Sequence, residues 1–353
     1  MKLSQEEYKQ YDRHLILEGV GEAGQLKLKQ AKVLVIGAGG LGCPILQYLT
    51  AAGVGTIGVV DHDVVDQSNL QRQVLYGIND IGVYKVDAAI SRLAKLNPFV
   101  QFVGYKERLD KNNALDIMKQ YDIVVDGSDN FPTRYLVNDT SLIAGKPLVF
   151  GSIFKFEGQV SVFNYKNGPS YRCLFPNPPK DNQVPNCSEI GVLGVLPGII
   201  GSFQANETLK IILEQEEVLS GKLLMLDALS MAIHKFNINK TEALAINTLL
   251  DDYDFFCGIS QVNTITYNEL REHEDLYELL DVRTSEERAT FHIGGYHIPL
   301  HELETRFQEI ETNKPIVVYC KSGMRSKKAI DLLSEKLNNN LIQLDKGIAD
   351  QIS

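Results

Sequence analysis

The sequence predicts an α/β protein in which a Rossmann-like, doubly wound mixed sheet precedes a smaller α/β domain. Short apolar runs alternate with helical patterns through the first part of the chain, which is typical of parallel strands joined by crossover helices. A second strand–helix alternation begins near residue 264. The length of 353 residues also suits about two domains. We therefore expect a first domain over residues 1–245, a linker over 246–263 and a second domain over 264–353.

The elements of the first domain follow from its apolar runs. Before about residue 32 the chain is polar with scattered apolar residues, and we expect helix there. Five short apolar runs are typical of strands buried on both faces. They cover residues 33–36, 56–60, 100–105, 123–125 and 148–150. Connecting helices are predicted over 44–52, 85–96 and 133–144.

The rest of the chain is less regular. An added strand is predicted over 159–164, a proline-rich crossover loop over 170–186 and a helix over 192–213, followed by short strands over 223–227 and 234–238. In the second domain the pattern indicates strands over 277–281, 316–320 and 341–344, with a helix over 326–337.

The formal net charge of −10 argues against a general surface for nucleic acid or anionic membranes, because phosphate-rich partners need a basic face. The five cysteines are an odd number scattered along the chain, which is a poor disulfide framework and indicates a reducing compartment. The polar start predicts no signal peptide. The longest apolar stretch, residues 190–203, is too short and too broken by glycines for a membrane span. We therefore expect a cytoplasmic protein that binds neither nucleic acid nor membranes.

A glycine-rich loop stands between the first predicted strand and the helix after it. Its spacing is Gly37-x-Gly39-x-x-Gly42, and Gly40 lies inside it. Glycines in this context allow a tight turn and a close approach of backbone N–H groups to phosphate. Asp61 ends the next strand, where it can accept hydrogen bonds from ribose hydroxyls. Alone, these residues predict a dinucleotide-binding fold; a glycine turn needed only for helix–strand packing is the alternative.

The residues after Asp61 differ from those of a dehydrogenase. Ser68, Asn69 and Arg72 follow it closely, and Lys85 begins a helix. Asp126-Gly127-Ser128-Asp129-Asn130 closes the strand over 123–125. Ligands bind at the carboxyl ends of such strands, so we expect Arg72 and Lys85 to neutralise a triphosphate. Asp129 would hold Mg²⁺, which prefers oxygen ligands. Solvated surface charge is the alternative for each cation.

Residues 5–240 resemble the MoeB/ThiF family of ubiquitin-activating-enzyme-like adenylyltransferases. The N-terminal and strand-end motifs that carry this resemblance are Tyr11-Asp12-Arg13-His14, Gly37–Gly42, Ala51–Gly55, Ser68–Gln73, Gly82-x-x-Lys85 and Asp126-x-x-Asp129-Asn130. Two later motifs, Tyr171–Pro176 and Gly191–Gly198, extend it. Jointly these motifs are far more specific than the glycine loop alone.

The resemblance implies a ThiF-type fold and the ATP-dependent activation of a ubiquitin-like sulfur carrier of the MoaD or ThiS kind. The carrier's C-terminal carboxylate would attack the α-phosphate, a reaction that depends on positioning and charge neutralisation. Arg13 matches an arginine that family members supply to the neighbouring subunit, which implies a homodimer. The residues that we assign to ATP and Mg²⁺ are Gly37, Gly39, Gly40, Gly42, Asp61, Ser68, Asn69, Arg72, Lys85, Asp129 and Asn130.

Two cysteine patterns depart from the family. Zinc-binding members carry two Cys-x-x-Cys pairs, whereas this chain reads Ser170-x-x-Cys173 and Asp254-x-x-Cys257. Only Cys173 and Cys257 remain of the four ligands, so we predict no structural zinc. Cys187 precedes a predicted helix N-terminus, where a thiol becomes nucleophilic; some relatives use a cysteine here and others do not. Cys43 is expected to be packed core.

The second domain carries a cysteine loop. Asp281-Val282-Arg283 follows one strand, and Cys320-Lys321-Ser322-Gly323-Met324-Arg325-Ser326 follows another just before a helix. Backbone N–H groups of such a loop, with Lys321 and Arg325, would hold Cys320 as a reactive thiolate or bind a tetrahedral oxyanion.

Residues 264–350 resemble a single rhodanese domain, whose loop cysteine carries a persulfide. A cysteine followed five residues later by arginine is also similar to phosphatase loops, but the Asp281–Arg283 and Ile298-Pro299-Leu300 motifs favour rhodanese. The chain ends in Asp345–Asp350 where active rhodaneses usually have a Gly-Gly-x-x-x-Trp-like segment. An inactive docking domain is therefore the alternative.

Together the two domains predict an adenylyltransferase–sulfurtransferase. The first would activate a carrier carboxylate, and Cys320 would supply sulfur to form a thiocarboxylate, with molybdopterin synthesis favoured over thiamine synthesis or tRNA thiolation. A persulfide donor such as a cysteine desulfurase would load Cys320. The residues assigned to catalysis are Arg13, Arg72, Lys85, Asp129, Cys187, Cys320 and Arg325. A nicotinamide-dependent oxidoreductase and a non-catalytic scaffold that docks a carrier are the alternatives from other classes.

Overall fold

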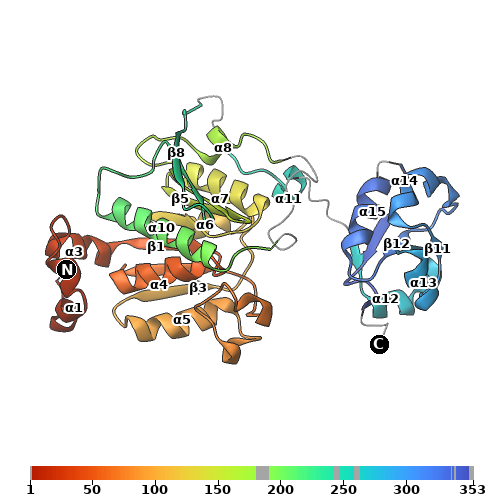
Figure 1. Ribbon diagram of the computed structural model, residues 1–353, viewed down its shortest axis with the longest axis horizontal. Helices are drawn as coiled ribbons and strands as arrows, with labels where there is room; N and C mark the ends of the chain where they lie inside the picture. Colours follow the sequence, from red (N-terminus) through yellow and green to blue (C-terminus); the bar gives the residue numbers. More distant parts are fainter. Residues whose placement is uncertain are drawn as a thin grey trace. The chain divides into compact units, whose positions relative to one another are not determined.

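A computed structural model describes residues 2–179, 191–241, 246–257, 263–334, 336–337 and 339–349. The chain forms two compact units that divide at residue 258, and each unit is built around a sheet of its own (Figure 1). Among the described residues there is no helix whose length and apolar character would let it cross a membrane.

The larger unit is built on an eight-stranded sheet in the order β3-β2-β1-β4-β5-β6-β7-β8. Its strands are β1 (Lys32–Ile36), β2 (Thr56–Val60), β3 (Gln101–Tyr105), β4 (Ile123–Asp126), β5 (Leu148–Phe154), β6 (Glu157–Phe163), β7 (Lys222–Asp227) and β8 (Ile233–Asn237). β1 to β5 run parallel to one another, whereas β6 pairs antiparallel with β5, and β7 and β8 continue the antiparallel part. The predicted Rossmann-like mixed sheet is therefore confirmed.

The strand order reverses between β1 and β4, which is where ligands bind in sheets of this kind. In the register, Ile36 pairs with Val60 on one side and with Asp126 on the other. The residues that follow these three strand ends, Gly37, Asp61 and Gly127, therefore emerge at the same edge of the sheet.

Helices cover both faces of this sheet, because successive side chains of a strand point to opposite faces. Val33 and Val35 point into the core shared with α4 (Gly42–Ala52), α5 (Lys85–Leu96) and α10 (Val195–Ile212). Leu34 and Ile36 point into the core shared with α6 (Ala114–Met118) and α7 (Phe131–Ala144) (Figure 1).

The chain starts with α1 (Gln5–Gln10), α2 (Asp12–Leu15) and α3 (Gly21–Gln30). The segment predicted as a linker contains α11 (Tyr253–Phe256), which packs on α7 as part of the larger unit. α8 (Tyr171–Leu174) packs on the same helix. Short one-turn helices such as α8 and α11 leave little periodic signal in a sequence, and neither was predicted.

The smaller unit has a five-stranded parallel sheet in the order β11-β10-β12-β13-β9. The strands are β9 (Asn263–Ile265), β10 (Glu278–Asp281), β11 (Tyr296–His297), β12 (Ile316–Tyr319) and β13 (Leu341–Leu344). Its α-helices are α12 (Tyr267–Glu272), α13 (Ser285–Thr290), α14 (Leu303–Arg306) and α15 (Met324–Ser334). Asp281 pairs with Tyr319 in the register, so the segments that begin at Val282 and Cys320 leave the sheet side by side.

Candidate functional site

The glycine loop joins the end of β1 to the start of α4. Gly37 has φ +86°, and a Cβ there would lie 2.9 Å from the Gly127 carbonyl oxygen. A Cβ on Gly42 would collide with the Gly37 carbonyl. Larger residues are therefore excluded from both ends of the turn. No side chain caps the start of α4, although the Cys43 N–H donates to the Gly39 carbonyl at 2.9 Å; a helix N-terminus beside a glycine loop is suited to binding phosphate.

Asp61 is linked directly to the glycine loop. Its Oδ2 accepts a hydrogen bond from the Ala38 N–H at 2.8 Å, and its Oδ1 accepts one from the Asp63 N–H at 2.8 Å. Burial raises the pKa of Asp61, while Lys85 and these two N–H groups act in the opposite direction. The carboxylate that was predicted to contact a ribose is thus fixed by backbone atoms at the end of β2.

Lys85, the first residue of α5, reaches back to the same strand end. Its N–H donates to the Asp63 carbonyl at 2.9 Å, and its Nζ donates to Asp63 Oδ2 at 2.7 Å. The Lys85 side chain is only 7% exposed. Tyr76 donates from its hydroxyl to the Ala38 carbonyl at 2.7 Å, which ties the loop before α5 to the glycine loop. The structure therefore brings Lys85, Asp61 and the glycine loop together.

Arg72 and its neighbours lie on the other side of the glycine loop. A Cβ on Gly40 would lie 3.7 Å from Arg72 Cγ, and Arg72 Nη1 donates to the Ser68 carbonyl at 3.1 Å. Ser68 and Asn69 have local roles: the Ser68 hydroxyl donates to Asp66 Oδ1 at 2.6 Å, and Asn69 Oδ1 accepts from the Asp66 N–H at 3.3 Å. Asp66 caps the short helix Gln67–Asn69 with its side chain, and Asn69 completes the capping box.

Gln73 is a candidate that the sequence assignment did not include. Its side chain is buried beside Gly39, and its Oε1 has no hydrogen-bond partner among the described residues. A buried amide oxygen without a partner is costly, and Gln73 is therefore a further residue to test for nucleotide contact. The signal in the sequence was its position immediately after Arg72.

The loop after β4 abuts the glycine loop, since the Gly127 N–H donates to the Ile36 carbonyl at 2.8 Å. Asn130 caps α7 by accepting from the Thr133 N–H at 3.0 Å and donates weakly to Asp129 Oδ1 at 3.5 Å. The Asp129 carboxylate is exposed. An exposed carboxylate beside a phosphate-binding loop fits Mg²⁺, which binds one or two carboxylates together with substrate phosphates. Asp61, His62 and Asp63 also lie close enough together to share a cation.

Arg13 lies away from this site in its own chain. The preceding Tyr11 packs against Gly53 at the end of α4, and its hydroxyl accepts from Asn97 Nδ2 at 2.9 Å. The glycine loop is at the opposite end of α4, an 11-residue helix about 16 Å long. The Arg13 side chain is 88% exposed, so the structure does not bring it to the glycine loop of the same chain.

The cysteines of the larger unit occupy different surroundings. Cys43 is fully buried, and burial raises its pKa to about 12, as expected for packed core. Burial tends to raise the pKa of Cys173, but hydrogen bonds from Ser170 and Thr241 outweigh it and lower the pKa. Burial raises the pKa of Cys257 to about 12. Asp254 forms a bidentate ion pair with Arg108, with both distances 2.8 Å. Cys187 lies outside the described residues.

In the smaller unit, Cys320 begins the loop between β12 and α15. Its buried Sγ accepts hydrogen bonds from the Gly323 N–H at 3.2 Å and the Ser326 N–H at 3.4 Å. Gly323 has φ +90°, which turns its N–H toward the sulfur. Such a ring of donors stabilises a thiolate or a persulfide anion. The predicted N–H groups of the loop do contact the sulfur, while the roles of Lys321 and Arg325 stay predictions.

The unusual C-terminal segment supports this loop. The Ile348 N–H donates to the Cys320 carbonyl at 3.0 Å, and the Ala349 N–H donates to the Lys321 carbonyl at 2.9 Å. A Cβ on Gly347, at φ +67°, would clash with both carbonyls. Residues 347–349 therefore hold the cysteine loop in place, although this segment lacks the Gly-Gly-x-x-x-Trp-like pattern of active rhodaneses.

Comparison with known proteins covers both units. The ThiF family model matches residues 11–245, and the rhodanese-like domain model matches residues 266–350. The "Probable adenylyltransferase/sulfurtransferase MoeZ" of Mycobacterium tuberculosis is 43% identical, over 98% of this chain and 93% of that protein. The "Sulfur carrier protein adenylyltransferase" of Thermus thermophilus is 50% identical, over 73% of this chain and all of that protein. The crystal structure of E. coli MccB with MccA-N7isoASN is similar in fold, with a TM-score of 0.60 and 21% identity over 69% of this chain and 75% of that one.

Proposed function

The chain belongs to the ThiF family and ends in a rhodanese-like domain, and from this premise we propose a two-step reaction on a ubiquitin-like sulfur carrier of the MoaD or ThiS kind. The Mycobacterium tuberculosis relative, which matches 98% of the chain, is named as an adenylyltransferase/sulfurtransferase. In the first step ATP adenylylates the carrier's C-terminal glycine. In the second step sulfur from a Cys320 persulfide replaces the adenylate and yields a thiocarboxylate.

The single observation that carries the first step is the meeting of the glycine loop, Asp61 and Lys85 at one edge of the sheet. A carboxylate oxygen of the carrier attacks the α-phosphorus, and pyrophosphate leaves with the electron pair of the broken P–O bond. Loop N–H groups, Arg72 and Lys85 oppose the charge of the phosphates. Asp129 would hold Mg²⁺, which supplies further charge neutralisation when bound. Fixed dipoles and cations of this kind lower the barrier more than mobile water does.

The second step rests on Cys320. The outer sulfur of its persulfide attacks the acyl carbon, and AMP leaves with the electron pair of the carbon–oxygen bond. A thiol then cleaves the sulfur–sulfur bond of the resulting acyl disulfide and frees the thiocarboxylate. Cys187 is the candidate thiol in the chain; it would form a disulfide with Cys320, which an external thiol would reduce before a persulfide donor such as a cysteine desulfurase reloads Cys320.

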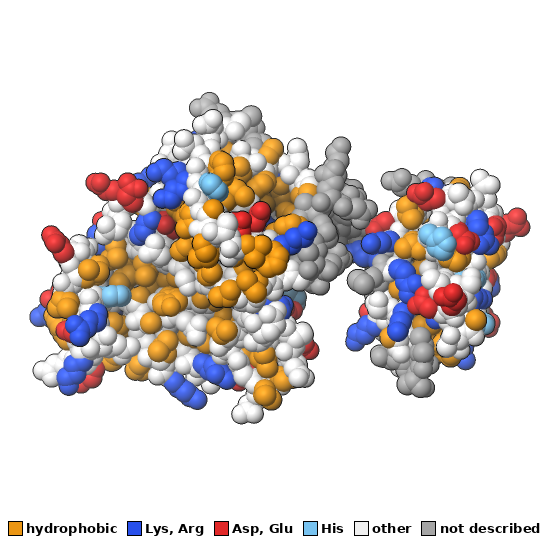
Figure 2. Space-filling view, in the orientation of Figure 1, with side chains coloured by type: hydrophobic (Ala, Val, Ile, Leu, Met, Phe, Trp, Pro, Cys, Tyr) orange, Lys and Arg blue, Asp and Glu red, His pale blue; other side chains and the backbone are white. Residues whose placement is uncertain are grey.

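The surface for the carrier is proposed from exposed apolar side chains at one end of the larger sheet. Leu229, Met231, Ile233 and Phe236 are exposed on the β7–β8 hairpin. The neighbouring Phe156 is exposed at the β5–β6 turn and accepts a hydrogen bond through its carbonyl from the Ala228 N–H at 2.9 Å. Figure 2 shows apolar side chains gathered on the face that carries β8 and α10. An apolar patch rimmed by polar residues suits a protein partner.

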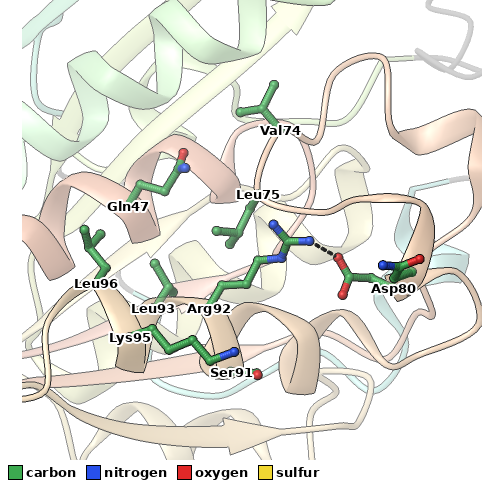
Figure 3. A pocket seen from close by; sticks show the side chains of 10 residues that line it. Gln47, Val74, Leu75, Asp80, Ser91, Arg92, Leu93, Lys95 and Leu96 are labelled. Carbon is green, nitrogen blue, oxygen red and sulfur yellow. Dashed lines mark hydrogen bonds and ion pairs between the residues drawn. The ribbon is translucent and has the colours of Figure 1, made fainter.

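A homodimer is proposed from Arg13 and the surface next to Arg72. Arg13, Ile16 and Leu17 are exposed on the N-terminal segment. A pocket of about 560 Å³ is lined by side chains from α4 and α5 and from residues 74–80, a segment that comes shortly after Arg72 in the chain (Figure 3). Val74 and Leu96 are exposed at this pocket. An Arg92–Asp80 ion pair at 2.6 Å crosses the pocket. A second copy that covers these apolar residues would bring its own Arg13 toward the phosphate site.

Molybdopterin synthesis is the destination that we favour, with thiamine synthesis and tRNA thiolation as alternatives that use the same activation chemistry. Carrier-dependent exchange of pyrophosphate into ATP tests the proposal: each MoaD- or ThiS-like candidate is assayed separately. Exchange with one carrier identifies the partner. Exchange with none would favour a docking scaffold, and turnover that depends on a nicotinamide would favour an oxidoreductase.

A further inference from the structure

An ion pair stands beside the cysteine loop of the smaller unit. Arg325 Nη1 donates to Glu287 Oε2 at 2.6 Å, and Nη2 donates to Oε1 at 2.7 Å. The pKa of Arg325 is raised, chiefly by these bonds and to a smaller extent by the nearby Cys320 thiol. Both side chains remain about one-third exposed, at 34% for Arg325 and 31% for Glu287. The pair is therefore at the solvent-accessible rim of the Cys320 loop.

Glu287 is held in place from several directions. The Thr284 N–H and hydroxyl donate to its Oε2 at 3.1 Å and 3.2 Å. α13, which carries Glu287, is fixed by Arg283, whose Nη2 donates to the Phe291 carbonyl at 2.8 Å. The Arg325 guanidinium lowers the pKa of Glu287 to about 2. Glu287 thus presents a fixed, ionised carboxylate to Arg325 at neutral pH.

This arrangement pairs two arginines near Cys320 with carboxylates, although Arg288 also lies 3.6 Å from Asp281 and Lys321 adds a positive charge to the loop. Arg325 is neutralised by Glu287, and the buried Arg283 is neutralised by Asp281, with Nη2 to Oδ2 at 2.6 Å. Among the described residues, no charged group is a hydrogen-bond partner of the Cys320 sulfur, whose partners are the N–H groups of Gly323 and Ser326 and the Ser326 hydroxyl. Such dipoles stabilise the single charge of a thiolate or persulfide, but a dianion would gain less from an arginine already bound to a carboxylate than from an unpaired one.

We propose that Glu287 sets the sulfur-donor specificity of this domain: by pairing with Arg325, it makes the Cys320 loop a poor receptor for small dianionic donors such as thiosulfate. A persulfide on a protein thiol brings its sulfur with no more than one charge and needs no free cation at the rim. This inference rests on the proposed role of Cys320 as the sulfur carrier. To the proposed persulfide donor it adds a structural reason for the preference. Glu287 becomes a specificity-determining residue that does not itself touch the sulfur.

The two donors load Cys320 by the same balanced step. The Cys320 thiolate attacks the outer sulfur, a new sulfur–sulfur bond forms, and the old bond breaks with its electron pair leaving on sulfite or on the donor thiolate. No oxidant or reductant is consumed. Cyanide can then remove the outer sulfur as thiocyanate, which regenerates the Cys320 thiolate and gives a colorimetric readout.

The test compares full-length wild type with Glu287→Gln, which keeps the side-chain volume and an oxygen for the Thr284 cap but removes the charge. The donors are thiosulfate, a dianion, and methanethiosulfonate, a monoanion with a related leaving group. In Glu287→Gln we expect kcat/KM for thiosulfate to rise by severalfold to about tenfold, mainly through KM, because Arg325 becomes free to bind the anion. The rise for methanethiosulfonate should be smaller, and the thiosulfate gain should shrink with added salt.

The matched control is Glu309→Gln, which breaks another bidentate pair in the same unit, that with Arg306 at 2.7 Å for both bonds. It should leave the donor preference unchanged. The double variant Glu287→Gln/Arg325→Gln should lose the thiosulfate gain, since no cation is left to free.

An unchanged or lowered thiosulfate kcat/KM in folded Glu287→Gln would overturn the inference. If that variant does not fold, Glu287→Asp decides: its shorter side chain should pair less well with Arg325, so kcat/KM for thiosulfate should rise, and an unchanged or lower value would contradict the inference. Cys320→Ser separates this result from the proposed function, because turnover that survives in Cys320→Ser would remove Cys320 as the sulfur carrier, whatever Glu287 does.

Discussion

Asp63 accepts two hydrogen bonds from the same lysine: Lys85 N–H donates to its carbonyl at 2.9 Å, and Lys85 Nζ donates to its carboxylate at 2.7 Å. Asp63 is 53% exposed while Lys85 is 7% exposed, so the carboxylate holds the ammonium from the solvent side. The pairing places the cation next to Asp61 and the glycine loop before any nucleotide is bound. Preorganised charge of this kind costs no reorganisation during reaction.

This pairing predicts that Asp63 helps to position Lys85. We expect Asp63→Ala to lower carrier-dependent ATP–pyrophosphate exchange by roughly tenfold, the scale of one displaced charge contact, whereas Asp63→Glu should recover part of the rate. Lys85→Met should lose more than Asp63→Ala, because it removes the cation itself. Exchange in Asp63→Ala equal to wild type at all Mg²⁺ concentrations would show that the contact has no role in the reaction; rescue by high Mg²⁺ would point to a metal ligand instead.

The separation of the two chemistries predicts opposite behaviour of two variants. Asp129→Ala should abolish carrier-dependent pyrophosphate exchange, since removing the Mg²⁺ ligand exposes the phosphate charges. Cys320→Ala should retain exchange, because adenylylation precedes sulfur transfer. Isotope exchange with both purified variants and the same carrier checks this, and undiminished exchange in Asp129→Ala would refute the assignment of the metal ligand.

A buried charge network predicts a large stability effect in the larger unit. Arg172 donates to Asp139 with Nε and Nη2, each at 2.7 Å, and the Tyr253 hydroxyl donates to Asp139 at 2.8 Å. Because Arg172→Met leaves the buried Asp139 charge without its partner, we expect the free energy of unfolding to fall by about 3–5 kcal/mol. Glu214→Gln, which breaks the exposed Lys27 pair, should leave the free energy of unfolding nearly unchanged in the same denaturation experiment.

Asp126 predicts a pH-dependent effect. Burial raises its pKa, and its Oδ2 has no partner among the described residues although Ser128 Oγ is also unpaired. A raised folded-state pKa contributes stability below the unfolded pKa that is lost as the pH rises through the folded value. Asp126→Asn should therefore stabilise the larger unit more at pH 8 than under acidic conditions. Denaturation at both pH values measures the difference, and an equal or greater gain under acidic conditions would contradict this account.

The sequence predicted those parts of the molecule in which local pattern determines structure. The glycine loop, Asp61, Lys85 and the Cys320 loop each stand where an apolar strand ends, and parallel strands bring such ends to one edge. The mixed sheet was predicted for the same reason. The predicted fold and enzyme class are confirmed by the family matches and the named relatives. The roles of the individual site residues stay predictions.

What the sequence could not show are contacts between residues far apart in the chain. The ion pair between Glu287 and Arg325 joins residues that are 38 positions apart in the chain, and the hydrogen bond from Tyr253 to Asp139 joins residues that are 114 positions apart. Neither has a periodic signal, since each depends on which surfaces the folded sheet brings together. The one-turn helix α11 was missed because it is fixed by packing on α7 rather than by its own propensity.

Intact-mass analysis of the carrier tests the central claim most directly, that one chain both activates the carrier and gives it sulfur. The carrier is incubated with ATP, Mg²⁺, a persulfide donor and either wild type or Cys320→Ala, then reduced. We predict that wild type produces the mass increase of one oxygen replaced by sulfur, and that Cys320→Ala produces no thiocarboxylate while exchange of pyrophosphate continues. Thiocarboxylate formed equally well by Cys320→Ala would contradict the account.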